Sequence, residues 1–147
     1  MPLEGEYEPS AWDWVRDQVE KYERSNGEDA PNLFDTDYPV VVVTSVGNKT
    51  GKLRKNPVIR VEHDGKYLAI GSVGGAPKNP VWVYNLRADP HVELQDGPVR
   101  QDMIAREITG DEKAVWWDRA VAVYPDYAVY QASTDRVIPV FLLEPIG

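Results

Sequence analysis

Two Asp-Gly dipeptides place the strongest constraint on how this chain can fold. They lie at residues 64–65 and 96–97, and each stands between two short apolar runs. Asp-Gly between such runs is a strong signal for a β-hairpin with a two-residue turn, because both turn positions need positive φ angles that these residues tolerate. A continuous β-branched run at residues 40–43 adds a strand that is expected to be buried on both faces. The chain is therefore expected to form an antiparallel sheet of consecutive hairpins.

Helices are expected before and between these strands. An N-terminal helix is expected from near Ser10 to residues 26–27, with an apolar stripe made of Trp12, Val15, Val19 and Tyr22. Further strands are expected at residues 58–62, 67–72, 91–95, 99–108 and 137–143, and further helices at residues 81–88, 111–123 and 125–132. About six strands joined by hairpins, with helices inserted between them, predict an α+β fold built on a small antiparallel β-barrel.

The composition excludes several kinds of site. No cysteine is present among the 147 residues, which rules out disulfides, thiolate metal sites, iron–sulfur clusters and a cysteine nucleophile. The only histidines are His63 and His91, so we expect no metal centre. No apolar run approaches the ~20 residues of a membrane span, and the acidic N-terminus does not resemble a signal peptide. A protein of the cytoplasm is therefore expected.

The acidic residues are concentrated at one end of the chain. Lys and Arg number 16 against 24 Asp and Glu, a net charge of −8, which argues against nucleic acid and anionic membranes as partners. Residues 1–38 hold 11 acidic and three basic residues and carry the whole excess, whereas residues 39–147 are neutral. We interpret residues 1–38 as an acidic helical extension that lies on a barrel formed by residues 39–147. Within the neutral part, residues 44–61 contain five basic side chains and no acidic one.

That basic segment contains a turn that suits an anion. Gly47 and Gly51 are expected to let the backbone turn with its N–H groups outward, over residues 47–57. The side chains of Lys49, Arg54 and Lys55 are expected to converge there on a phosphate or carboxylate. The spacing is not that of a P-loop. A solvated hairpin tip accounts for the same residues equally well on composition alone.

Two other segments suggest a ligand pocket. Residues 71–82 run from a strand through paired glycines to a helix start, where free N–H groups and close backbone approach suit a flat, acceptor-rich ring. Tyr124, Tyr127 and Tyr130 are spaced by three, so Tyr127 and Tyr130 share one helix face and can wall an apolar pocket. The alternatives are an ordinary strand-to-helix loop and core packing of the tyrosines.

In this order, the three segments resemble the deazaflavin-dependent nitroreductase family of actinobacteria. The shared patterns are T-x-x-G-x-K-T-G-x-x-R-x-N-P at residues 44–57, S-x-G-G-A-x-x-N-P-x-W-x-x-N-L-x-A-x-P at residues 72–90 and Y-P-x-Y-x-x-Y-Q-x-x-T-D-R-x-I-P at residues 124–139. The resemblance extends over about residues 38–145. It implies a split antiparallel β-barrel of the FMN-binding, flavin-reductase type. It also implies that the barrel binds coenzyme F420, an 8-hydroxy-5-deazaflavin with a phospholactyl-oligoglutamate tail.

The resemblance further implies roles for individual residues. The phosphate end of the cofactor would be bound by Lys49, Thr50, Arg54, Lys55, Asn56 and Pro57. The deazaflavin ring would lie among Val58, Ser72, Val73, Trp82, Asn85 and Tyr127. The substrate side would be lined by Ser72, Tyr124, Tyr127 and Tyr130, of which Tyr130 or Tyr127 would orient the acceptor and deliver a proton. The chain departs from the family pattern at Val73, where a lysine is usual, at Asn48, where an arginine is usual, and at Val83-Tyr84.

The activity implied by the resemblance is that of an F420-dependent oxidoreductase. Its reduced cofactor would pass a hydride to an electron-poor small molecule such as a quinone, an enone or a nitroaromatic. The departures keep two alternatives open, a non-catalytic F420 carrier and an FMN-using relative of the same barrel. A nucleic-acid module and stable membrane insertion are not expected, whereas a homo-oligomer is compatible with the sequence.

Overall fold

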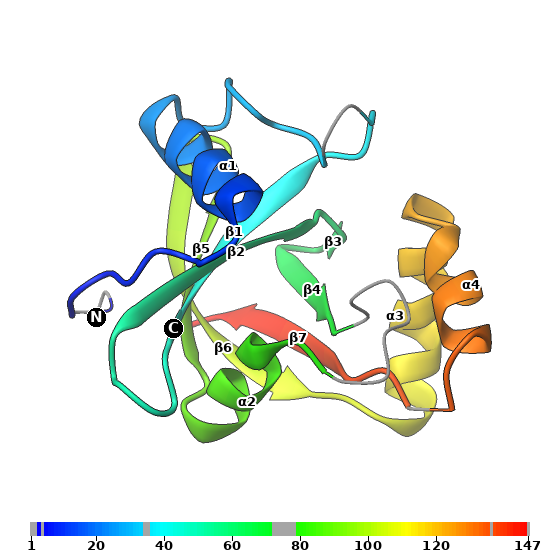
Figure 1. Ribbon diagram of the computed structural model, residues 1–147. Helices are drawn as coiled ribbons and strands as arrows, with labels where there is room; N and C mark the ends of the chain where they lie inside the picture. The colour runs from blue at the N-terminus through cyan, green and yellow to red at the C-terminus, as the bar shows by residue number, and fades with distance from the viewer. Residues whose placement is uncertain (1–2, 4, 34–35, 72–78, 136, 147) are drawn as a thin grey trace.

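The computed structural model describes residues 3, 5–33, 36–71, 79–135 and 137–146. In this part of the chain, seven strands form one antiparallel sheet, and four helices lie around it (Figure 1). The strand order is β2-β1-β5-β6-β7-β4-β3. The elements are α1 (Asp13–Arg24), β1 (Val40–Val46), β2 (Leu53–Ile59), β3 (Glu62–His63), β4 (Lys66–Ile70), α2 (Val81–Ala88), β5 (His91–Asp96), β6 (Val99–Glu107), α3 (Gly110–Val123), α4 (Asp126–Ala132) and β7 (Val140–Pro145).

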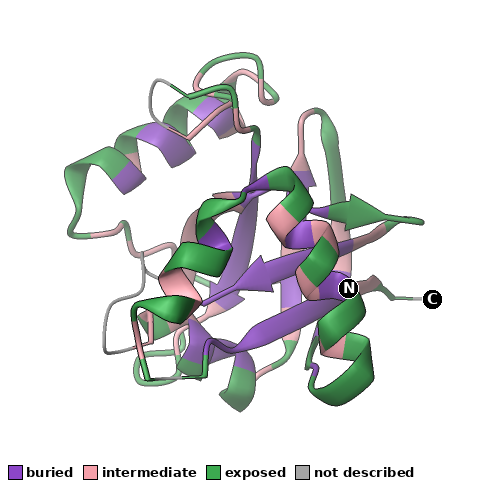
Figure 2. Ribbon diagram, turned by 90° about the vertical axis from the view of Figure 1, so that its right-hand side faces the viewer, coloured by how far each residue is buried: buried purple, intermediate pink, exposed green. Residues whose placement is uncertain are grey.

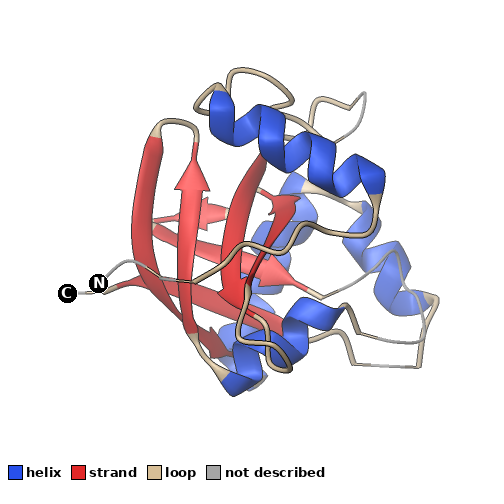
Figure 3. Ribbon diagram, turned by 60° about the vertical axis from the view of Figure 1, so that its left-hand side comes forward, coloured by secondary structure: helices blue, strands red, loops and turns tan. Residues whose placement is uncertain are grey.

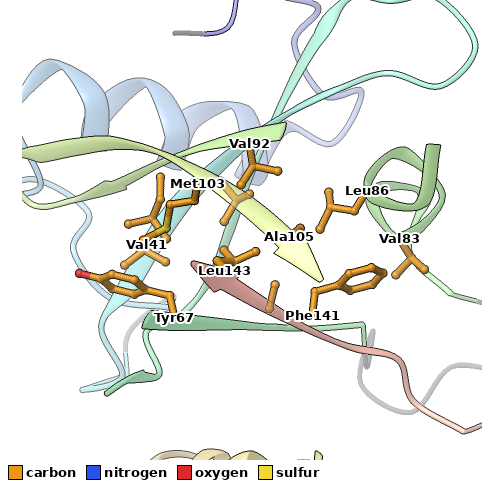
Figure 4. Close-up of a cluster of buried hydrophobic side chains, with 12 residues drawn as sticks. Val41, Tyr67, Val83, Leu86, Val92, Met103, Ala105, Phe141 and Leu143 are labelled. Atoms are coloured by element: carbon orange, nitrogen blue, oxygen red, sulfur yellow. The ribbon is translucent and has the colours of Figure 1, made fainter. Parts of the chain in front are cut away.

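The sheet curls into a barrel around an apolar core. β2 and β4 lie far apart in the strand order and yet touch each other, which requires strong curvature (Figure 3). The core includes Val41 and Val43 of β1, and Figure 4 shows it extending from Tyr67 at one end to Val83 and Leu86 of α2 at the other. This arrangement is the antiparallel barrel that the hairpin pattern predicts.

The outer faces of β1, β4 and β7 are also buried, because helices cover them (Figure 2), whereas the outer face of β6 is largely exposed. α3 and α4 pack on β4 and β7 through a second apolar cluster. α1 packs on β1 through a third, in which Val15, Val19 and Tyr22 meet Val40 and Val42. The prediction that residues 40–43 are buried on both faces is therefore confirmed. None of the described helices is both long and apolar enough to cross a membrane.

Part of the predicted stripe on α1 is wrong. Trp12 precedes the helix and is 66% exposed, so it does not belong to the buried face. Gln18 lies on that face instead. Its side-chain amide donates hydrogen bonds to the carbonyl oxygens of Ala30 (3.2 Å) and Asn32 (2.7 Å), which satisfies a polar group inside the interface. The polar residue fixes the loop that leads from α1 to β1.

Both predicted hairpins are present, and one of them is displaced by a residue. Asp64 and Gly65 have φ angles of 53° and 79°, as their turn requires. In the second hairpin Asp96 is paired with Val99, which leaves Gly97 and Pro98 as the turn residues.

The largest difference from the expected fold lies in β2. The strand begins at Leu53, whereas the sequence pattern places its start near residue 58, so half of the predicted anion-binding turn is strand. The cause is pairing with β1, which continues without interruption from Val40 opposite Ile59 to Val46 opposite Leu53. The N-terminal segment lies along the other edge of β2. There Leu53 N–H donates to Glu6 O (2.8 Å) and Glu8 N–H donates to Leu53 O (2.9 Å).

Candidate functional site

A small recess, with a volume of about 10 Å³, lies at the end of the barrel beside α2. Its lining comes from β1, β2, β4 and α2 and consists of Val43, Ser45, Asn56, Val58, Ala69, Trp82 and Leu86. The close packing of α2 depends on Gly71, because a Cβ atom there would lie 2.8 Å from a methyl group of Val83. The recess brings together three of the residues expected at a cofactor site, Asn56, Val58 and Trp82.

Two residues of α2 connect the recess to its surroundings. Trp82 forms part of the wall and meets Phe141 edge to face, with ring centroids 6.0 Å apart. Asn85 is buried, and its Oδ1 accepts the backbone N–H of Asn48 at 3.0 Å. Asn85 therefore links α2 to the β1–β2 turn. Its expected position beside a deazaflavin ring stays a prediction.

Four backbone donors of the turn between β1 and β2 point into the chain and not outward as expected. Gly47 N–H donates to Lys52 O (2.8 Å), and Gly51 N–H donates to Gly47 O (2.9 Å). The N–H groups of Asn48 and Lys52 also donate within the chain, to Asn85 and to the Thr50 hydroxyl. Lys49 and Thr50 are exposed at the tip of this turn. The backbone donors of these four residues are therefore not available to an anion.

The expected convergence of three cations is also wrong, because β2 separates two of them. Consecutive residues of a strand point to opposite faces. Arg54 shares its face with Asn56 and Val58, which line the recess. Lys55 lies on the opposite face, beneath α1, together with Pro57.

Lys55 is occupied by the N-terminal part of the chain. Its Nζ lies 2.5 Å from Oε2 of Glu23 on α1 and 4.8 Å from the ring centre of Tyr7. Its side chain is 19% exposed. These contacts anchor α1 to the barrel and direct the ammonium group away from the recess.

Arg54 is paired more loosely. One of its terminal nitrogens lies 2.9 Å from Oε2 of Glu8. The side chain of Arg54 is 34% exposed and that of Glu8 is 39% exposed. Glu8 belongs to the segment that lies along the edge of β2. Arg54 therefore remains accessible beside the recess, and its planar guanidinium retains N–H donors suited to a phosphate.

The three tyrosines form a separate cluster with α3 and α4. Tyr124 and Tyr127 belong to the apolar cluster on the outer face of β4 and β7, and Tyr130 packs against it. The hydroxyls of Tyr124 and Tyr130 are hydrogen-bonded at 2.8 Å. Burial raises the pKa of both Tyr124 and Tyr127 well above its ordinary value. Like unshifted tyrosines, both side chains are protonated near neutral pH and can donate a hydrogen bond.

Two expected site residues, Ser72 and Val73, lie outside the described residues. Among the described residues, no cluster of three or more metal-ligating side chains is found.

Sequence reasoning missed Ser45, which lines the recess. The available signal was its spacing of two from Val43, which places both on one face of a strand. The sequence did not indicate which face of β1 would meet the recess.

The sequence model of the family "F420H(2)-dependent quinone reductase" matches residues 14–145. A Mycobacterium tuberculosis protein named F420H(2)-dependent quinone reductase Rv1261c is 32% identical over 108 residues, which cover 71% of this chain and 72% of that protein.

Solved structures show the same similarity. One described as an F420-H2 dependent reductase (FDR-A) has 47% identity and a TM-score of 0.70, and the match covers 77% of this chain and 100% of the other. Another, described as a domain-swapped dimer, has 44% identity and a TM-score of 0.73, with 92% of this chain and 100% of the other covered.

A more distant match concerns the fold alone. A structure from Listeria innocua described as a pyridoxamine 5′-phosphate oxidase has 15% identity and a TM-score of 0.53, over 74% of this chain and 84% of the other. The expected split β-barrel is thereby confirmed.

Proposed function

The chain belongs to the F420H(2)-dependent quinone reductase family, and from this membership we propose that it is an oxidoreductase that uses reduced coenzyme F420 to reduce quinones. The observation that carries the proposal is the joint presence of an apolar, tryptophan-walled recess and an accessible arginine beside it. A flat ring with an anionic tail needs an apolar wall and a cationic group, and the recess, with a volume of about 10 Å³, marks such a wall and has to widen to admit the ring.

The residues of the recess suit this cofactor. Val58 and Trp82 supply apolar surface for a ring, and Asn56 supplies a side-chain amide that can bond a polar group. Ser45 adds a buried hydroxyl that has no partner in the described part of the chain. The lining thus combines apolar walls with a few polar groups, as is usual for small-molecule sites.

We propose that Arg54 binds the phosphate of the tail with parallel hydrogen bonds, and that Lys49 and Thr50 at the nearby turn assist it. Asn56, Val58, Trp82 and Asn85 would orient the ring, together with Ser72, Val73 and Tyr127. Lys55 and Pro57 are assigned instead to the interface with α1, because they lie on the other face of β2. When bound, reduced F420 supplies a hydride, so the protein's own task is to bind, orient and exclude water.

The tyrosine cluster is proposed to serve the acceptor. Tyr130 or Tyr127 would donate a hydrogen bond to the acceptor oxygen, where negative charge develops during reduction, and Tyr124 would hold Tyr130 through their 2.8 Å contact. Like any tyrosine, Tyr127 is protonated near neutral pH, and its raised pKa keeps it protonated at higher pH as well. Enones and nitroaromatics are proposed as further acceptors because they share the electron-poor character of a quinone.

A cytoplasmic location is also proposed, supported by the absence of cysteine.

The experiment that tests this function is a pair of fluorescence titrations with F420 and FMN, followed by turnover with reduced F420. Menadione, an enone and a nitroaromatic serve as acceptors. We expect tighter binding of F420 than of FMN and cofactor-dependent reduction of menadione. Binding of F420 without turnover of any acceptor would indicate a carrier, and preferential binding of FMN would indicate a flavin enzyme.

A homo-oligomer is proposed as a separate feature. Its support is the relative with 44% identity that is described as a domain-swapped dimer. Size-exclusion chromatography with light scattering measures the mass directly. A particle of 16.6 kDa at all concentrations would contradict the proposal.

A further inference from the structure

Ser45 carries a polar group that the fold leaves unmatched. The residue is 1% exposed, and its hydroxyl has no hydrogen-bond partner in the described part of the chain. A buried hydroxyl without a partner lowers stability, and folded proteins seldom keep one. Ser45 also lines the recess beside α2. The unmatched hydroxyl is therefore at the place where a ligand is expected.

Two other buried polar atoms without a hydrogen bond provide a comparison within the described residues. They are Nε2 of His91 and Oε1 of Gln95. His91 Nε2 lies 3.5 Å from a carboxylate oxygen of Asp102, and the amide nitrogen of Gln95 donates to Gly97 O at 3.0 Å. Both side chains thus have a polar neighbour within the chain, and neither lines the recess. Ser45 differs in both respects.

The register of β1 and β2 places Ser45 beside Arg54. Ser45 lies directly opposite Arg54, and the next pair on the same face is Val43 with Asn56. Directly opposed side chains in an antiparallel pair have Cβ atoms about 4.5–5.5 Å apart. The hydroxyl is therefore at the junction between the apolar recess and the side chain of Arg54.

We propose that Ser45 is a further cofactor-binding residue, whose hydroxyl forms a hydrogen bond with the polar chain that joins the deazaflavin ring to the phosphate of F420. This inference rests on the proposed function. A hydroxyl can donate and accept, so it suits a chain that carries both kinds of group. Binding satisfies the hydroxyl that the protein alone leaves unmatched, and Ser45 thereby connects the ring site to Arg54.

The test compares Ser45→Ala with Thr44→Val. Thr44 is the matched control, because it is also buried in β1 but lies on the opposite face, paired with Lys55. We expect Ser45→Ala to raise the Kd for F420 by about 3- to 10-fold, the range for one lost hydrogen bond. Without cofactor, its melting temperature should equal or exceed that of the wild type, since an unsatisfied group has been removed. Thr44→Val should leave the Kd unchanged.

A second variant keeps the outcome clear. Ser45→Val places two methyl groups at the junction and should weaken F420 binding more than Ser45→Ala does. If Ser45→Ala lowers the melting temperature and leaves the Kd unchanged, the hydroxyl is structural and the inference is wrong while the proposed function stands. If the wild type itself does not bind F420, the proposed function and the inference fail together.

Discussion

Two arginines at opposite ends of β2 show how differently one strand can use the same side chain. Arg60, just beyond the strand, donates from Nε to Oδ2 of Asp96 at 2.9 Å, and the hydroxyl of Tyr67 donates to the same oxygen at 2.6 Å. All three residues belong to the barrel, and Figure 4 shows Tyr67 at the end of the core opposite Val83 and Leu86 of α2. Arg60 is 38% exposed, so it is no more buried than Arg54, and this end is closed by groups that satisfy one another and not by burial of the arginine.

Arg54 stands at the other end, next to the recess and α2. Its acidic partner is Glu8, which belongs to the N-terminal segment and not to a strand of the barrel. A cation held by the barrel itself is committed to the fold, whereas a cation held only by a segment at the edge can exchange that partner for a ligand. The comparison teaches that the partner, more than the residue type, distinguishes a structural arginine from a binding one.

The largest effect is expected from Arg54→Ala. Loss of a charge-assisted hydrogen bond to the tail should weaken F420 binding by about 1.5–3 kcal/mol, or roughly 10- to 150-fold in Kd. The free energy of unfolding should change by less than about 1 kcal/mol, because the pair with Glu8 is partly exposed. Fluorescence titration and urea unfolding measure the two quantities. An unchanged Kd would show that Arg54 does not bind the tail.

The converse result is expected from Arg60→Ala. Asp96 would lose its main cationic partner, so the free energy of unfolding should fall by about 1–2 kcal/mol, allowing for the partial exposure of the pair. F420 affinity should stay at the wild-type value. Urea unfolding monitored by circular dichroism measures the first quantity. A loss of affinity similar to that of Arg54→Ala would remove the proposed distinction between the two ends.

Alkaline pH should weaken the closed end. Burial, followed by the hydrogen bond to Asp96, raises the pKa of Tyr67 from 10.0 to about 12. The folded chain therefore keeps this proton at pH values where the unfolded chain has lost it, and the associated stability disappears as pH rises from about 10 to 12. Urea unfolding across this range should show a shallower decline for Tyr67→Phe than for the wild type. Equal slopes would mean that Tyr67 does not contribute.

The smallest effect is expected from Glu8→Gln. Removing the carboxylate frees Arg54 from a competing anion, so F420 should bind about 2- to 5-fold more tightly, in keeping with a partly exposed pair. Glu6→Gln is the control, since it removes the same charge from the same segment, where Glu6 contributes its backbone carbonyl to Leu53. If both variants change the Kd equally, the effect is one of net charge and Glu8 has no specific competition with the ligand.

Much of the fold could be predicted from local patterns. The hairpin at residues 64–65, the helix α2 and the doubly buried run of β1 all agree with the structure, because turn chemistry and β-branched runs act over a few residues. The start of β2 could not be predicted, because its first half, Leu53–Asn56, has no apolar alternation. Only pairing with β1 makes that half a strand.

The candidate site was predicted less completely for the same reason. Asn56, Val58 and Trp82 were expected near the ligand and do line one recess. Lys55 was expected beside Arg54, but the alternation of the strand turns it toward Glu23 on α1. Ser45 was missed, because a serine within an apolar run shows no chemistry until its face and its neighbours are known.

By itself, the sequence determined that this chain forms antiparallel hairpins, that it resembles deazaflavin enzymes, and that its acidic residues concentrate in the first quarter. The tertiary structure decided that Glu8 and Glu23 come to lie against Arg54 and Lys55, and on which face of β2 each cation points. The reason is physical. A strand's period is local, but its register, and with it the face that meets the core, is set by contacts between residues far apart in the chain.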